Sequence, residues 1–210
     1  MDELRDDDPK VVQIRKAATR LFLQRGFGRV STSDLAKEAG VSKETLYSRY
    51  PNKDAVLADV LQHLISTGRG DQEPIPRLRS RADLKNALLD FTRLLGSQLM
   101  QRDYIELARV VIAETPRLPN VAEIFWRSVP ERSLGRAAAL LESACDAGLI
   151  GETDVVAAAR MLVGPVIIQV LQHGLLAAPR SDRSRIPPLD TETHVHPLLA
   201  VLSSTKKVKK

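Results

Sequence analysis

Residues 14–57 read IRKAATRLFLQRGFGRVSTSDLAKEAGVSKETLYSRYPNKDAVL, and this stretch decides the fold of the N-terminal part of the chain. Its first apolar residues recur at i, i+3, i+4, i+7 and i+8, the spacing of one face of an amphipathic helix. They are Ile14, Ala17, Ala18, Leu21 and Phe22. The spacing predicts a helix that starts near Pro9 and ends before Gly26. Gly26 is expected to take the left-handed conformation after the helix, with Phe27 folding back onto it.

Two short helices joined by a glycine turn follow in the same stretch. Ser31 and Asp34 have the spacing of a capping box, which opens the first of these helices. Gly40 ends that helix, and Ser42 can cap the next one. The positions expected to face inward are Leu35, Ala36, Ala39, Leu46 and Tyr50. Two helices in this arrangement form a helix-turn-helix, the motif that lays its second helix in the major groove of DNA.

The remainder of the chain is also expected to be helical, which makes the fold class all-α. Asn52 can cap a fourth helix, with Leu57 and Leu61 among its inward residues. A polar segment with two Gly and two Pro, residues 67–76, marks a boundary. Beyond it, helices are predicted at about 81–100, 103–115, 119–129, 131–148, 154–177 and 191–203. The predicted domains are a DNA-binding domain (1–66), a linker (67–80), a helical ligand-binding and dimerisation domain (81–205) and a basic tail (206–210).

Positive charge is concentrated in the N-terminal part of the chain. Residues 9–53 carry ten Lys or Arg against three Asp or Glu, a formal charge of +7, although the whole chain carries only +5. Such a patch attracts a polyanion through release of counterions, and a solvated charged face is the alternative interpretation. The distribution therefore favours a nucleic acid as partner of this part of the chain.

The stretch 14–57 closely resembles the DNA-binding domain of the TetR family of bacterial regulators. The matching features are Ala17-Ala18, Leu21-Phe22, Gly26-Phe27, Ser31-Thr32, Leu35-Ala36, Ala39-Gly40-Val41-Ser42, Leu46-Tyr47 and Lys53. Tyr50 stands where the family most often has Phe, so its ring is expected in the core with its hydroxyl on a partner or water. The resemblance implies a homodimeric transcriptional regulator, most often a repressor, that binds a palindromic double-stranded DNA operator and releases it when a small-molecule effector binds.

The resemblance also implies which residues contact DNA. The family's contact positions fall on Thr32, Ser33, Ser42, Lys43, Glu44, Thr45, Tyr47, Ser48 and Lys53. Hydroxyls and backbone N–H groups at helix N-termini suit phosphate, and Lys53 would add a point charge. Lys43 could donate to guanine, whereas Glu44 could accept from cytosine, repel wrong sequences or pair with Lys43. Tyr47 is expected at a phosphate and the groove wall.

Residues beyond the linker are expected to form a ligand-binding site and a dimer interface. An apolar or amphipathic ligand is expected between helices near Phe91, Arg109, Trp126, Gln169 and His173. Trp126 could equally be core, and His173 could be a structural histidine. Small and apolar faces on the helices at 131–148 and 154–177 predict a four-helix dimer interface. Its residues are expected to be Ala137, Leu141, Ala144, Ala159, Val163, Ile167 and Val170.

Several other classes of protein are not favoured by the sequence. The N-terminus has no apolar core of a signal peptide, and Met161–Ile168 is far shorter than a membrane span, so a cytoplasmic protein without membrane contact is expected. A single cysteine, Cys145, excludes an intramolecular disulfide and a multi-cysteine metal site. No cofactor loop or nucleophile motif is found in residues 81–205, so the chain is not expected to be an enzyme or to need a cofactor. An architectural DNA-binding protein without an effector remains the alternative.

Overall fold

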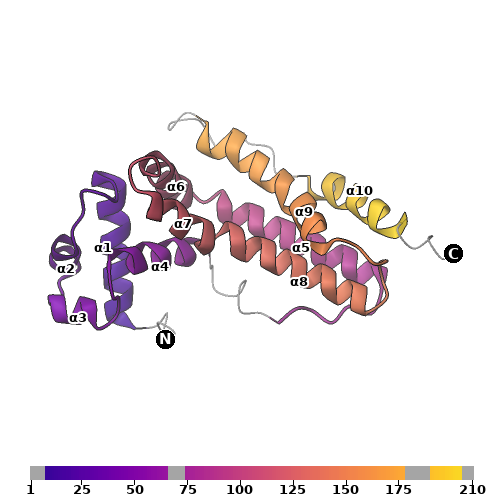
Figure 1. Cartoon of the computed structure of the whole chain (residues 1–210), viewed down its shortest axis with the longest axis horizontal. Helices are drawn as coiled ribbons and strands as arrows, with labels where there is room; N and C mark the ends of the chain where they lie inside the picture. The colour runs from indigo at the N-terminus through magenta and orange to yellow at the C-terminus, as the bar shows by residue number, and fades with distance from the viewer. Residues whose placement is uncertain (1–7, 66–73, 178–189, 205–210) are drawn as a thin grey trace. The chain divides into compact units, whose positions relative to one another are not determined.

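The computed structural model describes residues 8–65, 74–177 and 190–204, and every regular element within these ranges is a helix. The helices pack into two compact units. We call them the N-terminal unit, Met1–Ile65 with Arg102–Pro130, and the C-terminal unit, Ser66–Gln101 with Glu131–Lys210. Figure 1 shows the helices of both units. The all-α fold expected from the sequence is confirmed.

The N-terminal unit is built on a long first helix. Its elements are α1 (Pro9–Arg25), α2 (Thr32–Ala39), α3 (Lys43–Tyr47), α4 (Lys53–Ile65), α6 (Arg102–Glu114) and α7 (Pro119–Ser128). Helix α1 packs against α2, α4 and α6, and α2 packs against α3. The core lies between these helices and includes Ile14, Phe22, Leu35, Leu46 and Leu57, all fully buried.

Helices α2 and α3 begin at the capping residues predicted from the sequence, Ser31 and Ser42. The Ser31 side chain accepts from the Asp34 N–H while the Asp34 carboxylate accepts from the Ser31 N–H, a complete capping box. Ser42 accepts from the Thr45 N–H in the same way at the start of α3. Short helices gain little from backbone hydrogen bonds alone, so these caps supply partners for N–H groups that would otherwise have none.

The turn after α1 differs in detail from the expectation. Gly26 has a positive φ of 77°, but its ψ is 160°, so it does not adopt the left-handed helical conformation that we expected. Its N–H still donates to the Phe22 carbonyl, and the Phe27 ring returns to within 5.3 Å of the Phe22 ring. Only glycine adopts this combination of angles without strain, so the turn depends on Gly26.

A buried polar network joins α1 to α4. Arg15 is buried on α1 and donates to both carboxylate oxygens of Asp59, at 2.5 and 2.8 Å. The Tyr50 hydroxyl donates to the same carboxylate, and Arg15 also contacts the Nδ1 of His63 at 3.1 Å. The hydroxyl of the fully buried Tyr50 therefore finds the partner that its position requires. Burial and the neighbouring Asp59 carboxylate raise the pKa of Tyr50 far above its ordinary value, so it stays protonated.

Helices α6 and α7 pack with the N-terminal helices although they lie forty residues further along the chain. Helix α6 packs against α1 and α4, and α7 packs against α4. The Asn120 amide on α7 donates to the Asp54 carboxylate on α4 at 3.0 Å. The compact units therefore do not follow the linear division into 1–66, 67–80 and 81–205. That division remains a prediction about which segments act as separate functional domains.

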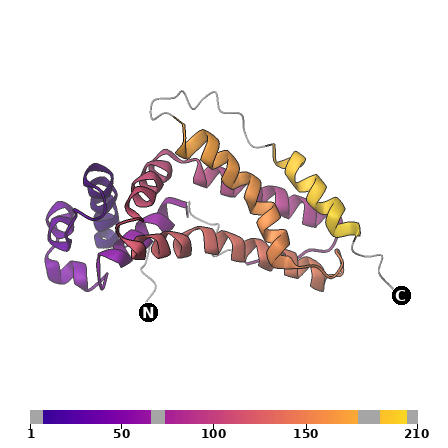
Figure 2. The ribbon, with the colours of Figure 1, turned by 45° about the horizontal axis from the view of Figure 1, so that its top comes forward.

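The C-terminal unit contains α5 (Arg81–Leu99), α8 (Pro130–Asp146), α9 (Val155–Val170), the π-helical segment η1 (Leu171–Leu175) and α10 (Thr191–Ser204). Most helices beyond the linker begin and end within two residues of the expected positions, whereas the helix expected at 154–177 ends as α9 at Val170 and continues as η1 to Leu175. Helix α5 packs against α9 and α10, which also pack against each other. Gly96 on α5 lies against Val166 of α9. Figure 2 shows α9 and α10 on one side of α5. The basic tail at 206–210 lies outside the described residues.

Helix α9 is unusually apolar. With η1 it forms 21 residues, Val155–Leu175, in which an 18-residue window has a mean hydropathy of 1.7, long and apolar enough by composition to cross a membrane. One side of this helix is buried in the unit, including Ala158, Leu162 and Val166. Pro165 and Arg160 interrupt its apolar character. Such composition is also typical of a core helix in a water-soluble protein, and the buried side is consistent with that interpretation.

Candidate nucleic-acid interface

Helix α3 presents the residues that the sequence assigns to DNA. Leu46 and Tyr50 point into the core, as expected from their spacing. Lys43, Glu44 and Ser48 are exposed, and the Tyr47 side chain keeps 50% of its surface accessible. An aromatic ring that is half exposed on a short helix offers both apolar area and a hydroxyl to a partner.

Two hydroxyls from different helices meet beside α3. The Tyr47 hydroxyl at the end of α3 lies 3.0 Å from the Thr32 Oγ1 at the start of α2. Ser33 follows Thr32 and is exposed. The N-terminus of α2 therefore lies close to the Tyr47 hydroxyl. Hydroxyls next to a helix N-terminus make a suitable environment for a phosphate group.

The remaining hydroxyls of α3 are used within the helix. Ser42 Oγ lies 3.1 Å from Thr45 Oγ1, and Ser48 Oγ donates to the Thr45 carbonyl at 2.9 Å. A hydroxyl oxygen that donates to the backbone can still accept from a partner. These three residues therefore shape the ends of α3 and remain predicted, not demonstrated, DNA contacts.

The exposed charges of α3 have opposite signs. Lys43 and Glu44 occupy the first turn of α3. The N–H of Glu44 itself, the Ser42 side chain and the Lys43 charge all lower the pKa of Glu44 below its ordinary value. Glu44 is therefore a carboxylate at neutral pH and offers only acceptors to a base edge. Lys43 offers only donors. The two side chains could therefore bind different groups on the base edges, Lys43 the acceptors and Glu44 the donors.

Lys53 has a role that the sequence did not reveal. Its ammonium donates to the carbonyls of Phe27 and Val30, at 2.9 and 2.8 Å, and lies 4.2 Å from the centre of the Phe27 ring. Burial lowers the pKa of Lys53, and the nearby Asp54 and Glu114 carboxylates oppose this shift. Two of the three ammonium donors are thus committed to the turn before α2. A phosphate contact through the third remains a prediction.

One basic residue beside α3 was missed. Arg49 follows Ser48, donates to its Oγ at 3.1 Å, and also donates to the Asp8 carboxylate at 2.7 Å. The ion pair ties the start of α1 to the end of α3. Asp8 also caps α1 by accepting from the Lys10 N–H. An arginine directly after the last residue of a predicted reading helix was a signal in the sequence, but its partner Asp8 lies 41 residues away and could not be identified.

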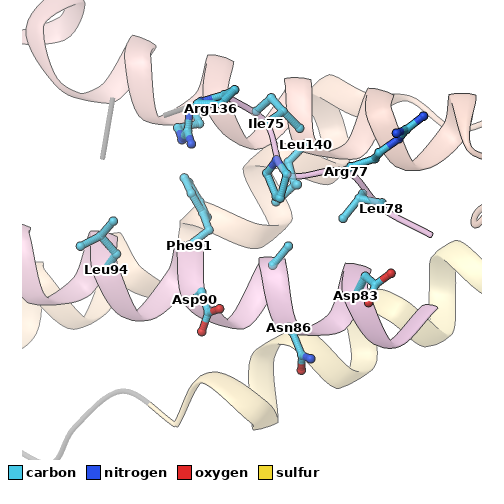
Figure 3. Close-up of a pocket in the computed structure, with 13 residues that line it drawn as sticks. Ile75, Arg77, Leu78, Asp83, Asn86, Asp90, Phe91, Leu94, Arg136 and Leu140 are labelled. Atoms are coloured by element: carbon cyan, nitrogen blue, oxygen red, sulfur yellow. The ribbon is translucent and has the colours of Figure 1, made fainter. Parts of the chain in front are cut away.

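The residues expected to line a ligand site are divided between the two units. Phe91 lines a cavity of about 490 Å³ in the C-terminal unit. Figure 3 shows its ring pointing from α5 toward α8, where Arg136 and Leu140 lie. Arg109 and Trp126 belong to the N-terminal unit, and Trp126 is 52% exposed, so it is not part of the core. The assignment of this set to one ligand site stays a prediction, because helix periodicity marks a face but not the element it meets.

Gln169 and His173 lie in the same unit as Phe91, on α9 and η1, but neither lines this cavity. The cavity is instead bounded by α5, α8 and the segment before α5. Its apolar lining includes Ile75, Leu78 and Leu94. The segment 74–78 had been assigned to the linker, where no lining residue was expected.

Most residues expected at a dimer interface are buried within their own unit. Those with almost no exposed surface are Ala137, Leu141, Ala144, Ala159, Val163 and Val170. Their small apolar faces pack inside one chain, and their assignment to a surface between chains stays a prediction. Ile167 is exposed, as an interface residue must be. The exposed apolar residues of α9 and η1 are Val156, Met161, Ile167, Ile168 and Leu171.

Comparisons with known proteins support the assignment of both parts of the chain. Residues 14–60 match the sequence model of the bacterial regulatory proteins of the tetR family, and residues 86–187 match that of the C-terminal domain of AefR-like transcriptional repressors. The helix-turn-helix regulator EthR of Mycolicibacterium smegmatis is 28% identical over 152 residues, which cover 70% of this chain and 65% of EthR. An uncharacterised helix-turn-helix regulator of Mycobacterium bovis is 33% identical over 104 residues, 49% of this chain and 54% of that protein.

The alignments thus span less than two thirds of the length of these two relatives. Among solved structures, the flavonoid-responsive regulator FrrA is similar over 92% of this chain and 94% of its own, with a TM-score of 0.65 and 28% sequence identity. The likeness extends across both units, beyond the stretch that carried the resemblance in the sequence.

Proposed function

Because this chain belongs to the TetR family of bacterial transcriptional regulators, we propose that it is a repressor that binds a palindromic operator as a homodimer and leaves it when a small molecule binds. One observation carries the DNA-reading part of this proposal. Helix α3 exposes Lys43, Glu44 and Tyr47 on one side while Leu46 anchors its other side in the core. The interior of a bacterial cell, where DNA lies, is the compartment in which such a protein acts.

The DNA contacts that we propose separate into two kinds. Thr32, Ser33 and Tyr47, with the N-terminus of α2, suit phosphate oxygens and would position the protein on the duplex. Lys43 and Glu44 suit base edges in the major groove and would supply sequence preference. The surplus of positive charge in residues 9–53 supports binding to any duplex through counterion release.

The homodimer that we propose uses the exposed side of α9. Its large apolar residues lie in contact with solvent in a single chain, including Met161, Ile167 and Ile168. Contiguous apolar surface of this kind is uncommon on a monomer and marks an interface. A second copy of the same helix offers the same surface, so a two-fold axis beside α9 would bury both. A dimer also matches the two half-sites of a palindromic operator.

The effector that we propose is an apolar or amphipathic small molecule. The cavity of about 490 Å³ in the C-terminal unit has the size of sites that hold such molecules. Its walls combine Phe91, Leu94 and Leu140 with the charged Arg136. The related FrrA is described as flavonoid-responsive, which supports a ligand with a flat apolar body. The cavity also favours a ligand-responsive regulator over an architectural DNA-binding protein.

Selection from a random duplex library tests the proposal directly. The unmodified protein is expected to enrich a palindromic sequence, and binding to that duplex is expected to weaken when an apolar ligand found by thermal shift is added. Enrichment of no sequence would contradict the proposed operator, and ligands that bind without changing DNA affinity would contradict the proposed release.

A further inference from the structure

The turn between α1 and α2 sets where the predicted phosphate contacts lie. Residues 26–30 leave α1 and lead directly into Ser31, which caps α2, and into Thr32. Within residues 26–31 the turn has one backbone hydrogen bond of its own, from the Val30 N–H to the Phe27 carbonyl at 3.3 Å. A turn with so few internal bonds is held by side chains that reach it from other elements.

Two side chains of opposite charge reach this turn from two other helices. Lys53 at the start of α4 binds the carbonyls of Phe27 and Val30, as described above. Glu114 is the last residue of α6, and its Oε2 accepts from the Gly28 N–H at 3.0 Å. Two carbonyls of the turn therefore accept from a cation, and one N–H of the turn donates to an anion. In both cases the charge of the side chain strengthens the hydrogen bond.

Two glycines allow the carboxylate to approach so closely. A Cβ added at Gly26 would lie 2.4 Å from the Glu114 Oε1, and one at Gly28 would lie 2.8 Å from the Oε2 and 3.4 Å from Leu118. Gly26 also has a positive φ, which a residue with a side chain rarely adopts, so glycine is needed there for the backbone conformation as well. Gly28 has no positive φ. Its backbone would accept alanine, so a substitution at Gly28 tests the approach of Glu114 alone.

We infer that Glu114 is a positioning residue for DNA binding, which holds the α1–α2 turn from α6 while Lys53 holds it from α4. Glu114 does not touch DNA in this arrangement. It fixes the direction in which the chain enters α2, and through Ser31 it fixes the hydroxyl of Thr32 and the N-terminus of α2. The inference rests on the proposed function in that DNA affinity is one of its readouts.

The test compares three variants with a matched control. Glu114→Ala removes the acceptor, Glu114→Gln keeps an acceptor without the charge, and Gly28→Ala displaces the carboxylate. The control is Glu106→Ala, which removes the same charge from the same helix, where Glu106 accepts from the Arg102 guanidinium. Affinities are measured on the selected operator and on a random duplex, well below each variant's unfolding midpoint. Amide hydrogen exchange of residues 26–33 is measured without DNA.

Glu114→Ala and Gly28→Ala are each expected to weaken binding about two- to tenfold on both duplexes and to speed exchange of the amide at position 28. The double variant is expected to lose no more than the more affected single variant, because both changes break one contact. Glu114→Gln is expected to recover much of the affinity, and the Glu106→Ala control to stay within about twofold of the unmodified protein.

The inference is overturned if Glu114→Ala and Glu106→Ala behave alike, or if the losses of the two single variants multiply in the double variant. It is also overturned if exchange of the Gly28 amide is unchanged in Glu114→Ala, a result that needs no DNA. Failure of the proposed function is recognised separately, since the unmodified protein would then select no duplex.

Discussion

The Tyr47 hydroxyl lies 3.0 Å from the Oγ1 of Thr32, so the last residue of α3 and the first residue of α2 share one hydrogen bond. The two hydroxyls come from positions fifteen residues apart, on the two helices of the helix-turn-helix. The hydrogen bond fixes the rotation of the Tyr47 ring, which is otherwise half exposed. A single phosphate oxygen placed between the helices would meet both hydroxyls.

Tyr47→Phe is therefore expected to weaken binding to operator and random duplex alike, by about 0.5 to 1.5 kcal/mol, because it removes one neutral hydrogen bond. Tyr47→Ala is expected to lose more, since we expect the ring to contact the groove wall as well. Affinity measured by fluorescence anisotropy for Tyr47→Phe, Thr32→Ala and the double variant checks this. Additive losses would contradict a shared phosphate site.

Lys43→Ala is expected to cost on the order of 1 to 3 kcal/mol on the operator and to relax preference at one base pair in each half-site. The reason is that Lys43 is exposed in the first turn of α3, so its ammonium can donate to a base edge. Affinities of Lys43→Ala and the unmodified protein for a set of single-base operator variants measure this change in preference. A loss of the same size on operator and random duplex would assign Lys43 to the phosphate backbone instead.

Lys53→Met is expected to lower both DNA affinity and stability. The methionine retains the apolar stem, but the carbonyls of Phe27 and Val30 lose their donor. Hydrogen bonds to a charged donor are worth about 1.5 to 3 kcal/mol, and the partial exposure of Lys53 places the expected loss of stability near the lower value. Thermal unfolding and a salt series of DNA affinity are measured together. An unchanged unfolding midpoint with a smaller salt slope would mean that Lys53 acts only on phosphate.

Tyr50→Phe is expected to destabilise the N-terminal unit by about 1 to 2 kcal/mol while leaving sequence preference intact. The hydroxyl is buried and donates to Asp59, which also binds Arg15, so its loss leaves the carboxylate with one donor fewer. Chemical denaturation measures the change in the free energy of unfolding. A gain in stability would show that Arg15 alone satisfies Asp59 and that the phenylalanine of other family members packs better at this position.

Ile168→Arg is expected to yield monomers, because Ile168 is 53% exposed on the side of α9 that we assign to the dimer and a charge there would be desolvated without a partner. Ile112→Arg on α6 is the matched control, since Ile112 is 44% exposed but lies in the other unit. Light scattering at micromolar concentration measures both. The assigned face of α9 would be refuted by a dimer in Ile168→Arg. Ala159→Arg is unsuitable because Ala159 is only 1% exposed, so the variant would disrupt the fold of the chain itself.

Local signals in the sequence were sufficient for the helices and for the reading surface. Caps such as Ser31 and Ser42 satisfy N–H groups within three residues, so their partners can be read from spacing alone. The inward positions Leu46 and Tyr50 follow from a helical period and are both buried as expected. The same period places Lys43 and Tyr47 outside.

Contacts between distant segments were beyond the reach of such signals. A helical period shows that Ala137 and Val163 lie on apolar faces, but it does not show whether such a face meets its own chain or a second copy. For the same reason, a helical period places Phe91 and Trp126 on their helices without showing that Phe91 lines a cavity or that Trp126 is 52% exposed.

By itself, the sequence determined that this protein is all-helical, that its first sixty residues form a helix-turn-helix of the TetR family, and which side of α3 is exposed, because each depends on neighbours within a few residues. Only the tertiary structure decided that Lys53 binds the carbonyls before α2 and that Glu114, 86 residues beyond Gly28, binds the same turn from α6. Electrostatic pairs of this kind depend on distances in space, and no periodicity along the chain encodes them.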